Sequence, residues 1–204
     1  LESADYINMT IDAMKKAGVH VTVSEDRHAF HVVPAAYQSF DAAVESDWSQ
    51  AGFWYAANFL DNPVDVQGMN AYSTQGDMII AKYYWLLARP GENVDVDLST
   101  CPDLLPPLAV MAAVRSGTTR FVTRFTGGRR LRIKESDRLA TVYAMLTALG
   151  CSAEELPDAL IVHGGQPLTG GTVDGANDHR IVMAAAIAAS GCTEEVIITG
   201  SEAV

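Results

Sequence analysis

The sequence has few charged residues, and basic ones are the scarcest. Of its 204 residues only 19% are charged, and 14 Lys and Arg against 25 Asp and Glu give a net charge of −11. This shortage of positive charge argues against a general nucleic-acid surface, because such surfaces neutralise phosphates with many cations. The chain also lacks any uncharged apolar run near the ~20 residues of a membrane span. We therefore expect neither nucleic acid nor membrane as a partner.

Cysteine is also scarce, and its spacing matches no known site. The three cysteines, Cys101, Cys151 and Cys192, stand far apart, whereas metal-binding cysteines come in close pairs. No G-x-x-x-x-G-K-S loop is present, which argues against a nucleotide-binding α/β protein. Because the chain shows no signal-like start, we expect a cytoplasmic protein with reduced thiols and no metal site.

Hydrophobic residues, by contrast, make up 49% of the chain, which is typical of a globular core. Their order repeats along the chain. Apolar residues at helical spacing, in runs that end at a glycine, predict three similar helices at 1–18, 75–91 and 135–150. Helices that are apolar nearly all round, and so buried on several sides, are predicted at 51–60, 108–114 and 181–189.

Strands alternate with these helices. Residue alternation predicts a strand after each apolar helix, at 64–68, 119–124 and 195–200. It predicts two strands after two of the other helices, at 19–23 with 28–33 and at 151–156 with 158–163. The repeating unit is therefore strand–helix–strand–helix–strand–strand, roughly 60–70 residues long, and the fold class is α/β.

Two dense clusters of charge open directly into helix-like segments. Residues 132–139 read R-I-K-E-S-D-R-L, and residues 177–183 read N-D-H-R-I-V-M. Because unpaired N–H groups gather at helix N-termini, cations placed there predict a site for phosphate or carboxylate. A cluster of six cations within 15 residues also predicts an anion site, and the alternative is a solvated basic loop. The six are Arg124, Arg129, Arg130, Arg132, Lys134 and Arg138.

Together, in this order and a repeat length apart, the two strings resemble the 5-enolpyruvylshikimate-3-phosphate (EPSP) synthase family. The resemblance implies an α/β (α+β) fold of repeated βαβαββ units around a pseudo-three-fold axis. This is the enolpyruvyl transferase-like inside-out α/β barrel, and the chain holds an incomplete copy. The family has two such domains, with the active site in the cleft between them.

The same resemblance divides the chain. The string V-E-S-D-W-S-Q-A at residues 44–51 resembles the family's crossover between domains. Residues 1–43 then look like a remnant of the last repeat of the partner domain. Residues 44–204 look like the C-terminal enolpyruvyl transferase domain without its final segment. The family's N-terminal substrate-binding residues are absent, so we expect a missing N-terminal domain as the partner.

The resemblance also implies an enzyme of the shikimate pathway, which serves aromatic amino acid biosynthesis. This transferase moves the enolpyruvyl group of phosphoenolpyruvate to the 5-hydroxyl of shikimate 3-phosphate and releases phosphate, without metal or organic cofactor. Two anionic substrates explain the cations at the helix starts. Because the chain would supply about half of the active site, we expect it to be inactive alone.

The family's site residues carry over one by one. Asp103 matches the proton acceptor that touches the shikimate hydroxyls, Lys134 the lysine on the shikimate phosphate, and Glu135 a carboxylate beside the reacting methylene. These three are the expected catalytic residues. Ser3 and Tyr6 match a pair that contacts the shikimate phosphate from the opposite domain. From its sequence context alone, Asp103 is more simply interpreted as a helix cap.

Phosphoenolpyruvate is expected to lie on a second group of residues. Arg138 and Arg180 match two arginines that hold it, and a planar guanidinium suits a carboxylate or phosphate because it can pair through two bonds. His179 matches the family's active-site histidine, with a helix-start histidine bonded to backbone as the alternative. Asp178 is better interpreted as a cap than as a catalyst.

Two further interpretations stay open. The chain could be a catalytically inactive, truncated domain that only binds anionic ligands or assembles with another chain. Ser46 and Gln50, which replace the usual Gly and Ser of the crossover string, favour this slightly. The sister enzyme that acts on UDP-N-acetylglucosamine shares the fold but lacks K-E-S-D-R-L. Trp48, Trp54 and Trp85 are interpreted as packing residues.

Overall fold

A computed structural model describes residues 4–115 and 121–204 of the chain. Its α-helices are α1 (Ala4–Lys16), α2 (Trp48–Phe59), α3 (Ile80–Leu87), α4 (Leu105–Val114), α5 (Arg138–Ala148) and α6 (His179–Ala189). Its strands are β1 (Val21–Val23), β2 (Phe30–Val32), β3 (Val94–Asp97), β4 (Val122–Thr126), β5 (Ser152–Glu155), β6 (Leu160–His163), β7 (Gly171–Asp174) and β8 (Val196–Thr199). Short 3₁₀ helices are η1 (Gly76–Ile79), η2 (Pro102–Leu104), η3 (Arg129–Ile133) and η4 (Ser201–Ala203). Within the described residues, no helix is long and apolar enough to cross a membrane.

The middle of the chain forms one complete copy of the predicted unit. The elements β3, α4, β4, α5, β5 and β6 follow one another, and their strands form a sheet in the order β3-β4-β6-β5. β3 and β4 run parallel, whereas β6 is antiparallel to both of its neighbours. β7, α6 and β8 begin the next copy with a parallel pair. The predicted α/β class is confirmed.

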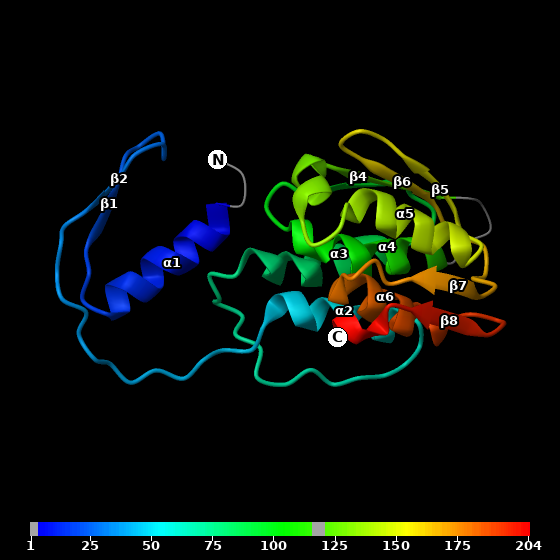
Figure 1. Cartoon of the computed structure of the whole chain (residues 1–204), viewed down its shortest axis with the longest axis horizontal. Helices are drawn as coiled ribbons and strands as arrows, with labels where there is room; N and C mark the ends of the chain where they lie inside the picture. Colours follow the sequence, from blue (N-terminus) through cyan, green and yellow to red (C-terminus); the bar gives the residue numbers. More distant parts are fainter. Residues whose placement is uncertain (1–3, 116–120) are drawn as a thin grey trace.

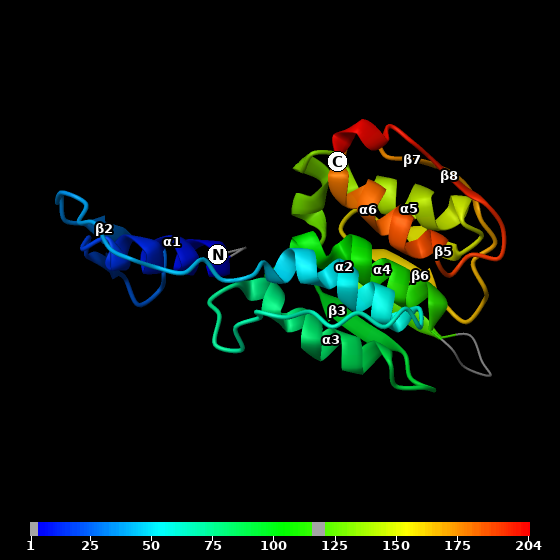
Figure 2. The ribbon, with the colours of Figure 1, turned by 90° about the horizontal axis from the view of Figure 1, so that it is seen from below.

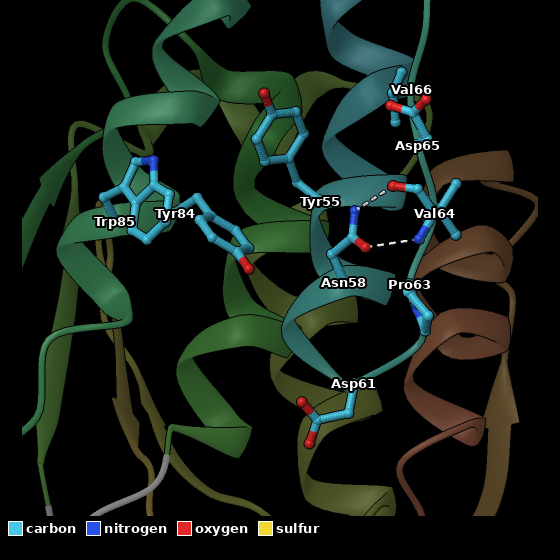
Figure 3. A pocket seen from close by; sticks show the side chains of 9 residues that line it. All are labelled: Tyr55, Asn58, Asp61, Pro63, Val64, Asp65, Val66, Tyr84 and Trp85. Carbon is cyan, nitrogen blue, oxygen red and sulfur yellow. Dashed lines mark hydrogen bonds between the residues drawn. The ribbon is translucent and has the colours of Figure 1, made fainter.

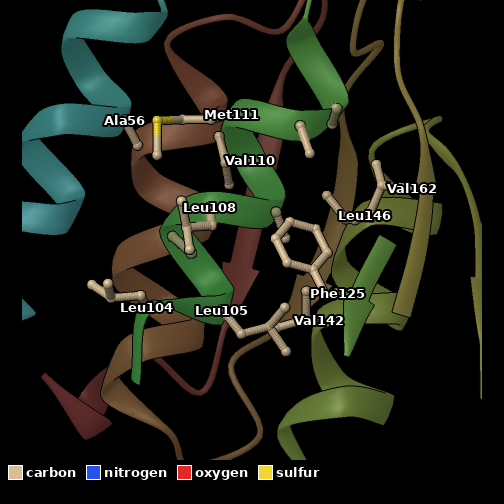
Figure 4. Close-up of a cluster of buried hydrophobic side chains, with 14 of the residues drawn as sticks. Ala56, Leu104, Leu105, Leu108, Val110, Met111, Phe125, Val142, Leu146 and Val162 are labelled. Carbon is tan, nitrogen blue, oxygen red and sulfur yellow. The ribbon is translucent and has the colours of Figure 1, made fainter. Parts of the chain in front are cut away.

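α4 lies at the centre of the core. All of Leu105–Ala113 is buried, because this helix is apolar on every side and can be surrounded by other helices. It contacts α2, α3, α5 and α6. Figure 4 shows Met111 of α4 facing Ala56 of α2, with Phe125 and Leu146 on the opposite side. The four-stranded sheet and the β7–β8 pair lie outside this cluster of helices (Figure 1), which is the predicted inside-out arrangement.

Glycine ends two of the helices, as the sequence predicts. Gly18 and Gly150 have φ values of +80° and +85°, a left-handed conformation that stops a helix and that glycine adopts without steric cost. In both places the chain then turns into a hairpin, β1–β2 after α1 and β5–β6 after α5. The stripe predicted for α5 is buried at every position, from Leu139 to Leu149.

The unit that contains α2 and α3 departs from the prediction. The strand predicted at 64–68 is wrong, because this segment is extended but pairs with no strand of the described chain. Its equivalent in the next unit, β4, lies between β3 and β6. Here α3 leads directly into β3, without a hairpin like β5–β6 after α5. Within the described chain, the segment 64–68 therefore lacks the strand that β6 provides for β4. Instead, the Asn58 side-chain amide binds both the N–H and the C=O of Val64, at 2.7 and 2.8 Å (Figure 3).

A buried arginine closes the turn where that hairpin is absent. Arg115 follows α4 and is 1% exposed. Its guanidinium donates hydrogen bonds to the carbonyls of Leu87, Arg89 and Glu92, at the end of α3 and in the turn into β3. The last carbonyls of a helix have no partner within the helix. Arg115 therefore supplies donors that a glycine-led turn would otherwise provide.

α1, β1 and β2 project from the rest of the molecule (Figures 1 and 2). None of the α1 residues is fully buried, and the helix meets the main body at its N-terminal turn. Gly76 permits this close approach, since a Cβ at that position would lie only 2.6 Å from Asp5 Oδ2. Beyond this contact, Tyr6 bonds to Asp103, 97 residues further along the chain. The first turn of α1 is thereby fixed beside the start of α4.

Candidate active site

Asp103 is the point on which the charged side chains converge. It lies in η2, directly before α4, and is 9% exposed. Its Oδ1 lies 2.7 Å from Arg138 Nη1 and 3.1 Å from Lys134 Nζ, and its Oδ2 lies 3.6 Å from Arg180 Nη2. No side-chain bond caps α4, so Asp103 is not the helix cap that its sequence context suggested.

The three cations set the protonation of this carboxyl. Burial alone would raise the pKa of Asp103, but the charges of Arg180, Lys134 and Arg138 outweigh it and hold the pKa below its ordinary value. Asp103 is therefore ionised near neutral pH. It can accept a hydrogen bond or a proton from a ligand that enters beside it.

Arg138, the first residue of α5, links the two charge strings. It is 1% exposed, and its guanidinium bonds to Asp103, to Glu135 Oε2 at 2.5 Å, and to both oxygens of Asp178 at 2.7 and 3.2 Å. Burial lowers the pKa of Arg138, but these carboxylates outweigh it and the net shift is upward. Every edge of this guanidinium is occupied, so Arg138 holds neighbouring carboxylates in fixed positions.

Asp178 is the helix cap that the sequence predicts. Its Oδ1 accepts from the Arg180 backbone N–H at the start of α6, and its Oδ2 accepts from Ser136 Oγ. Bonds to Arg138 lower its pKa more than burial raises it. The neighbouring His179 is peripheral, because its side chain is 35% exposed and its Nδ1 lies 4.0 Å from Asp178. A contact between His179 and a substrate stays a prediction.

The remaining predicted residues lie around the same centre. Lys134 reaches Asp103 from the end of η3, and the Glu135 side chain is 49% exposed, so its carboxylate faces solvent on one side. Tyr6 Oη donates to Asp103 Oδ2 at 3.0 Å and lies 3.5 Å from Asp77 Oδ2. Ser3 lies outside the described residues. Apart from Ser3 and the peripheral His179, the structure brings the expected residues together.

Asp77 is a site residue that the sequence interpretation missed. It lies in η1 and is 5% exposed. Burial, followed by the charge of Asp103, raises the pKa of Asp77 to about 6. The sequence held a signal, because the repeat places Asp77 at the same helix start as Asp137. A carboxylate at a helix start also interacts favourably with the helix dipole, so this position alone does not indicate a ligand.

A cavity of about 300 Å³ opens beside Asp103. Its polar lining includes Tyr6, Ser49, Asp77, Asp103 and Arg180. These residues come from the starts of four helical segments and from the second residue of α6. The lining also includes Glu45, Asp47 and Gln75. The cavity therefore combines one guanidinium, four carboxyls and two hydroxyls, which suits a ligand that carries hydroxyl groups and an anionic group beside Arg180.

The basic run between Arg124 and Arg138 does not converge as a whole. Arg132 turns away from Asp103 and bonds to Asp137, Glu155 and the carbonyls of residues 156 and 157. It thereby joins η3 to the β5–β6 hairpin. From this run, Lys134 and Arg138 contact Asp103. Proximity in sequence therefore placed Arg132 at the site, whereas the structure places it against the hairpin.

A larger groove of about 570 Å³ lies between α2, α3 and the segment after α2 (Figure 3). Tyr55, Tyr84 and Trp85 line it together with Asp61 and Asp65, and its lining contains no lysine or arginine. A groove with carboxylates and no cations does not suit an anion. The smaller cavity is therefore the candidate active site.

The tryptophans behave differently from one another. Trp48 is 5% exposed and packs in the core, as predicted, whereas Trp54 and Trp85 are 48% and 69% exposed. Trp85 packs edge-to-face on Tyr84 at the surface. Within the described chain, the hairpin that covers α5 has no counterpart over α3, so Trp85 stays largely exposed. Among the described residues, no group of three His, Cys, Asp or Glu side chains could hold a metal ion.

Comparison with known proteins is consistent along the chain. The family model described as EPSP synthase (3-phosphoshikimate 1-carboxyvinyltransferase) matches residues 1–204. Curated 3-phosphoshikimate 1-carboxyvinyltransferases of Clostridium acetobutylicum and Clostridium kluyveri are 39% and 38% identical. Each alignment covers 100% of this chain and 50% of the relative. The chain thus spans about half the length of the curated relatives it matches.

Solved structures agree on the fold. An EPSP synthase from Acinetobacter baumannii superimposes with a TM-score of 0.75 at 20% identity, over 93% of this chain and 49% of that one. The enolpyruvyl transferase NikO from Streptomyces tendae gives a TM-score of 0.63 at 14% identity, over 100% of this chain and 50% of its own. At these identities, the superpositions establish the shared architecture.

Proposed function

The chain belongs to the EPSP synthase family, and on this premise we propose that it supplies about half of the active site for enolpyruvyl transfer. The reaction takes the enolpyruvyl group from phosphoenolpyruvate to the 5-hydroxyl of shikimate 3-phosphate and releases phosphate. The convergence of Lys134, Arg138 and Arg180 on Asp103, at the edge of one cavity, carries this proposal. Few arrangements in an acidic chain suit two anionic substrates as well.

The two arginines have different parts in this proposal. Arg180 has a buried Nη1 with no hydrogen-bond partner among the described residues, and it lines the cavity. Arg138 is engaged on every edge by carboxylates. Arg180 therefore makes the first contact with phosphoenolpyruvate, while Arg138 mainly holds Asp103 and Glu135 in place. Lys134 and Tyr6 face the phosphate of shikimate 3-phosphate.

Substrate binding would strengthen Asp103 as a proton acceptor. In the free chain, three cations depress its pKa. An incoming phosphate or carboxylate draws Lys134 and Arg180 toward itself, so the pKa of Asp103 rises as the anions bind. The base thus becomes competent when the hydroxyl that it must deprotonate is present.

The bond changes follow from this arrangement. The 5-hydroxyl oxygen attacks C2 of phosphoenolpyruvate and its proton passes to Asp103, while Glu135, which first takes up a proton from solvent, donates that proton to the methylene carbon. The resulting tetrahedral intermediate then loses phosphate, and the added methyl group returns a proton to restore the double bond. Cations on both sides balance the charge that moves during these steps.

The rest of the site would come from outside these residues. We propose that residues 44–204 belong to the C-terminal enolpyruvyl transferase domain and residues 1–43 to the last repeat of its partner. Because the curated relatives are about twice as long, the remaining contacts correspond to the other half of those proteins. The cytoplasmic location expected from the sequence stays a prediction.

Calorimetric titration of the purified chain tests the proposal. We expect shikimate 3-phosphate to bind, Asp103→Ala to weaken it at least tenfold, and phosphate release from both substrates to be absent until the other half of the site is supplied. An inactive domain that only assembles with another chain would bind neither substrate. That result would overturn the proposal.

A further inference from the structure

Three buried polar atoms have no hydrogen-bond partner among the described residues, and they share one location. They are Ser49 Oγ, Asp77 Oδ1 and Arg180 Nη1. Each residue is less than 10% exposed, and all three line the cavity beside Asp103. Buried polar atoms are nearly always paired in native proteins. Three exceptions around a single cavity indicate the position of a ligand.

The two other carboxylates on the wall that holds Ser49 and Asp77 already accept hydrogen bonds. Asp47 caps α2 by accepting from the Ser49 and Gln50 N–H groups. Glu45 accepts from Asn70, Ser73 and Gln75 side chains. Neither carboxylate needs a ligand. The open positions on this wall are therefore specific to the Ser49 hydroxyl and the Asp77 carboxyl.

The unpaired atoms differ in whether they donate or accept a hydrogen bond. Arg180 presents a donor, which requires an anionic or carbonyl oxygen. On the other wall, the Ser49 hydroxyl lies beside the Asp77 carboxyl without meeting hydrogen-bond geometry. An ionised carboxyl can only accept, so it requires a donor such as a hydroxyl. The two walls together suit an anion at Arg180, where the proposed function places phosphoenolpyruvate, and a hydroxyl at Asp77 and Ser49, which shikimate 3-phosphate carries.

We propose that Asp77 and Ser49 form a hydroxyl-binding subsite that orients shikimate 3-phosphate in the cavity. This inference rests on the proposed function and adds two residues to it. The subsite fixes the ring opposite Arg180, so that the reacting hydroxyl lies between Asp77 and Asp103. Both are positioning residues for the substrate, whereas Asp103 remains the proton acceptor.

The charge around Asp77 fits this role. Four groups from different segments face it: Tyr6, Asp47, Asp103 and Arg180. Burial and the nearby carboxylates raise its pKa to about 6, so it is mostly ionised at pH 7.5. It then accepts from a hydroxyl, and a substrate hydroxyl would relieve a carboxylate that the protein itself leaves almost unpaired.

Titration with two ligands at pH 7.5 tests the subsite. Shikimate 3-phosphate reports on the whole cavity, and inorganic phosphate reports on the cations alone. Asp77→Leu keeps the branched shape of the side chain but removes the acceptor. We expect it to weaken shikimate 3-phosphate at least tenfold and to leave phosphate unchanged or tighter, since a carboxylate near Arg180 is gone. Asp77→Asn keeps an acceptor oxygen and should recover part of the loss.

Two further variants complete the experiment. Ser49→Ala should weaken shikimate 3-phosphate by about two- to tenfold, as expected for one neutral hydrogen bond. Asp95→Leu makes the same chemical change at an exposed position of β3 and should change neither affinity. Circular dichroism of each variant confirms that it is folded.

The outcomes separate the subsite from the proposed function. Equal shikimate 3-phosphate affinity in the wild type and Asp77→Leu overturns the subsite and leaves the proposed function standing. Parallel loss of both ligands in Asp77→Leu also overturns it, because Asp77 would then act on the cations. If the wild-type chain binds phosphate but not shikimate 3-phosphate, the proposed function fails, and the subsite fails with it.

Discussion

Asp178 and Asp77 are buried carboxylates that both stand at the start of a helical segment, but their surroundings are opposite. Asp178 is 0% exposed and accepts four hydrogen bonds, from Ser136, Arg138 and the Arg180 backbone. Asp77 is 5% exposed, and among the described residues it has a long contact from Tyr6 at 3.5 Å and the Ser49 hydroxyl beside it. The pKa of the first is lowered, and that of the second is raised to about 6.

This difference separates two uses of a buried charge. A carboxylate that is saturated with donors holds segments together, and its removal leaves the donors unpaired. A carboxylate that is left open costs stability in the free protein and becomes favourable only when a ligand supplies the missing donor. Variants of the two residues should therefore move stability in opposite directions.

The largest effect is expected at Asp178. Replacing it with alanine removes the α6 cap and leaves the buried Arg138 guanidinium without its main partner, so we expect a loss of about 3–5 kcal/mol in the free energy of unfolding. Urea unfolding monitored by circular dichroism measures this. The double variant Asp178→Leu with Arg138→Met, which removes both charges, should regain part of the loss. A decrease below about 1 kcal/mol would show that Asp178 is not structural.

Replacing Asp77 should increase the free energy of unfolding, in contrast to replacing Asp178. Its folded-state pKa is raised above the ordinary value, so between about pH 4 and pH 6 the folded state binds more protons than the unfolded state. Stability therefore falls as pH rises through this window, by at most about 3 kcal/mol. Asp77→Asn cannot ionise and should be more stable than the wild type at pH 7.5, by about 1–2 kcal/mol.

Urea unfolding of the wild type and of Asp77→Asn, measured between pH 4 and pH 7.5, isolates the stability change caused by ionisation of Asp77. The difference between wild type and Asp77→Asn should be small at pH 4 and full by pH 7. Asp103 and Asp178, whose pKa values are lowered, contribute stability that is lost only as pH falls below their ordinary range. A constant difference across the window would contradict the raised pKa of Asp77.

Tyr6 links α1 to two buried carboxyls, Asp103 and Asp77. Tyr6→Phe removes the 3.0 Å bond to Asp103 while keeping the ring, so we expect a loss of about 0.5–1.5 kcal/mol. Because no α1 residue is fully buried, the loss should appear locally. Hydrogen exchange should speed up in α1 and stay unchanged in α4. Equal acceleration in both helices would mean that α1 is not held by this contact.

The smallest effect is expected at Arg132. Its guanidinium bonds to Asp137 and Glu155, as Arg138 bonds to its carboxylates, but its side chain is 28% exposed. Solvent screens such pairs, so Arg132→Gln should cost within about 1 kcal/mol, and less in high salt. Urea unfolding at two salt concentrations measures this. A salt-independent loss as large as that of Asp178→Ala would remove the distinction between exposed and buried networks.

Local patterns predicted much of this architecture. Helix starts at Asp137 and Asp178 and helix ends at Gly18 and Gly150 follow from short-range rules of capping and backbone freedom. The convergence on Asp103 was reached through the resemblance of two strings to a known family. Composition and spacing alone favoured a helix cap there.

What could not be predicted depends on distant partners. The alternating residues 64–68 look like a strand, but a strand forms only where another strand lies beside it, and the hairpin that would provide one does not follow α3. The burial of Arg115 depends on carbonyls from 23 to 28 residues earlier. The open state of Asp77 depends on Tyr6 and Asp103, which come from other helices.

The clasp of Asn58 on Val64 has a consequence for the molecule's neighbours. An extended V-D-V segment with free backbone groups invites a strand from another molecule to pair with it, which is a common route to aggregation. The Asn58 amide occupies the Val64 N–H and C=O, and Pro63 offers no N–H at all. One side chain and one ring thus deny the adjoining backbone to a foreign strand. Asn58 thus removes two backbone groups through which a strand of another molecule could pair.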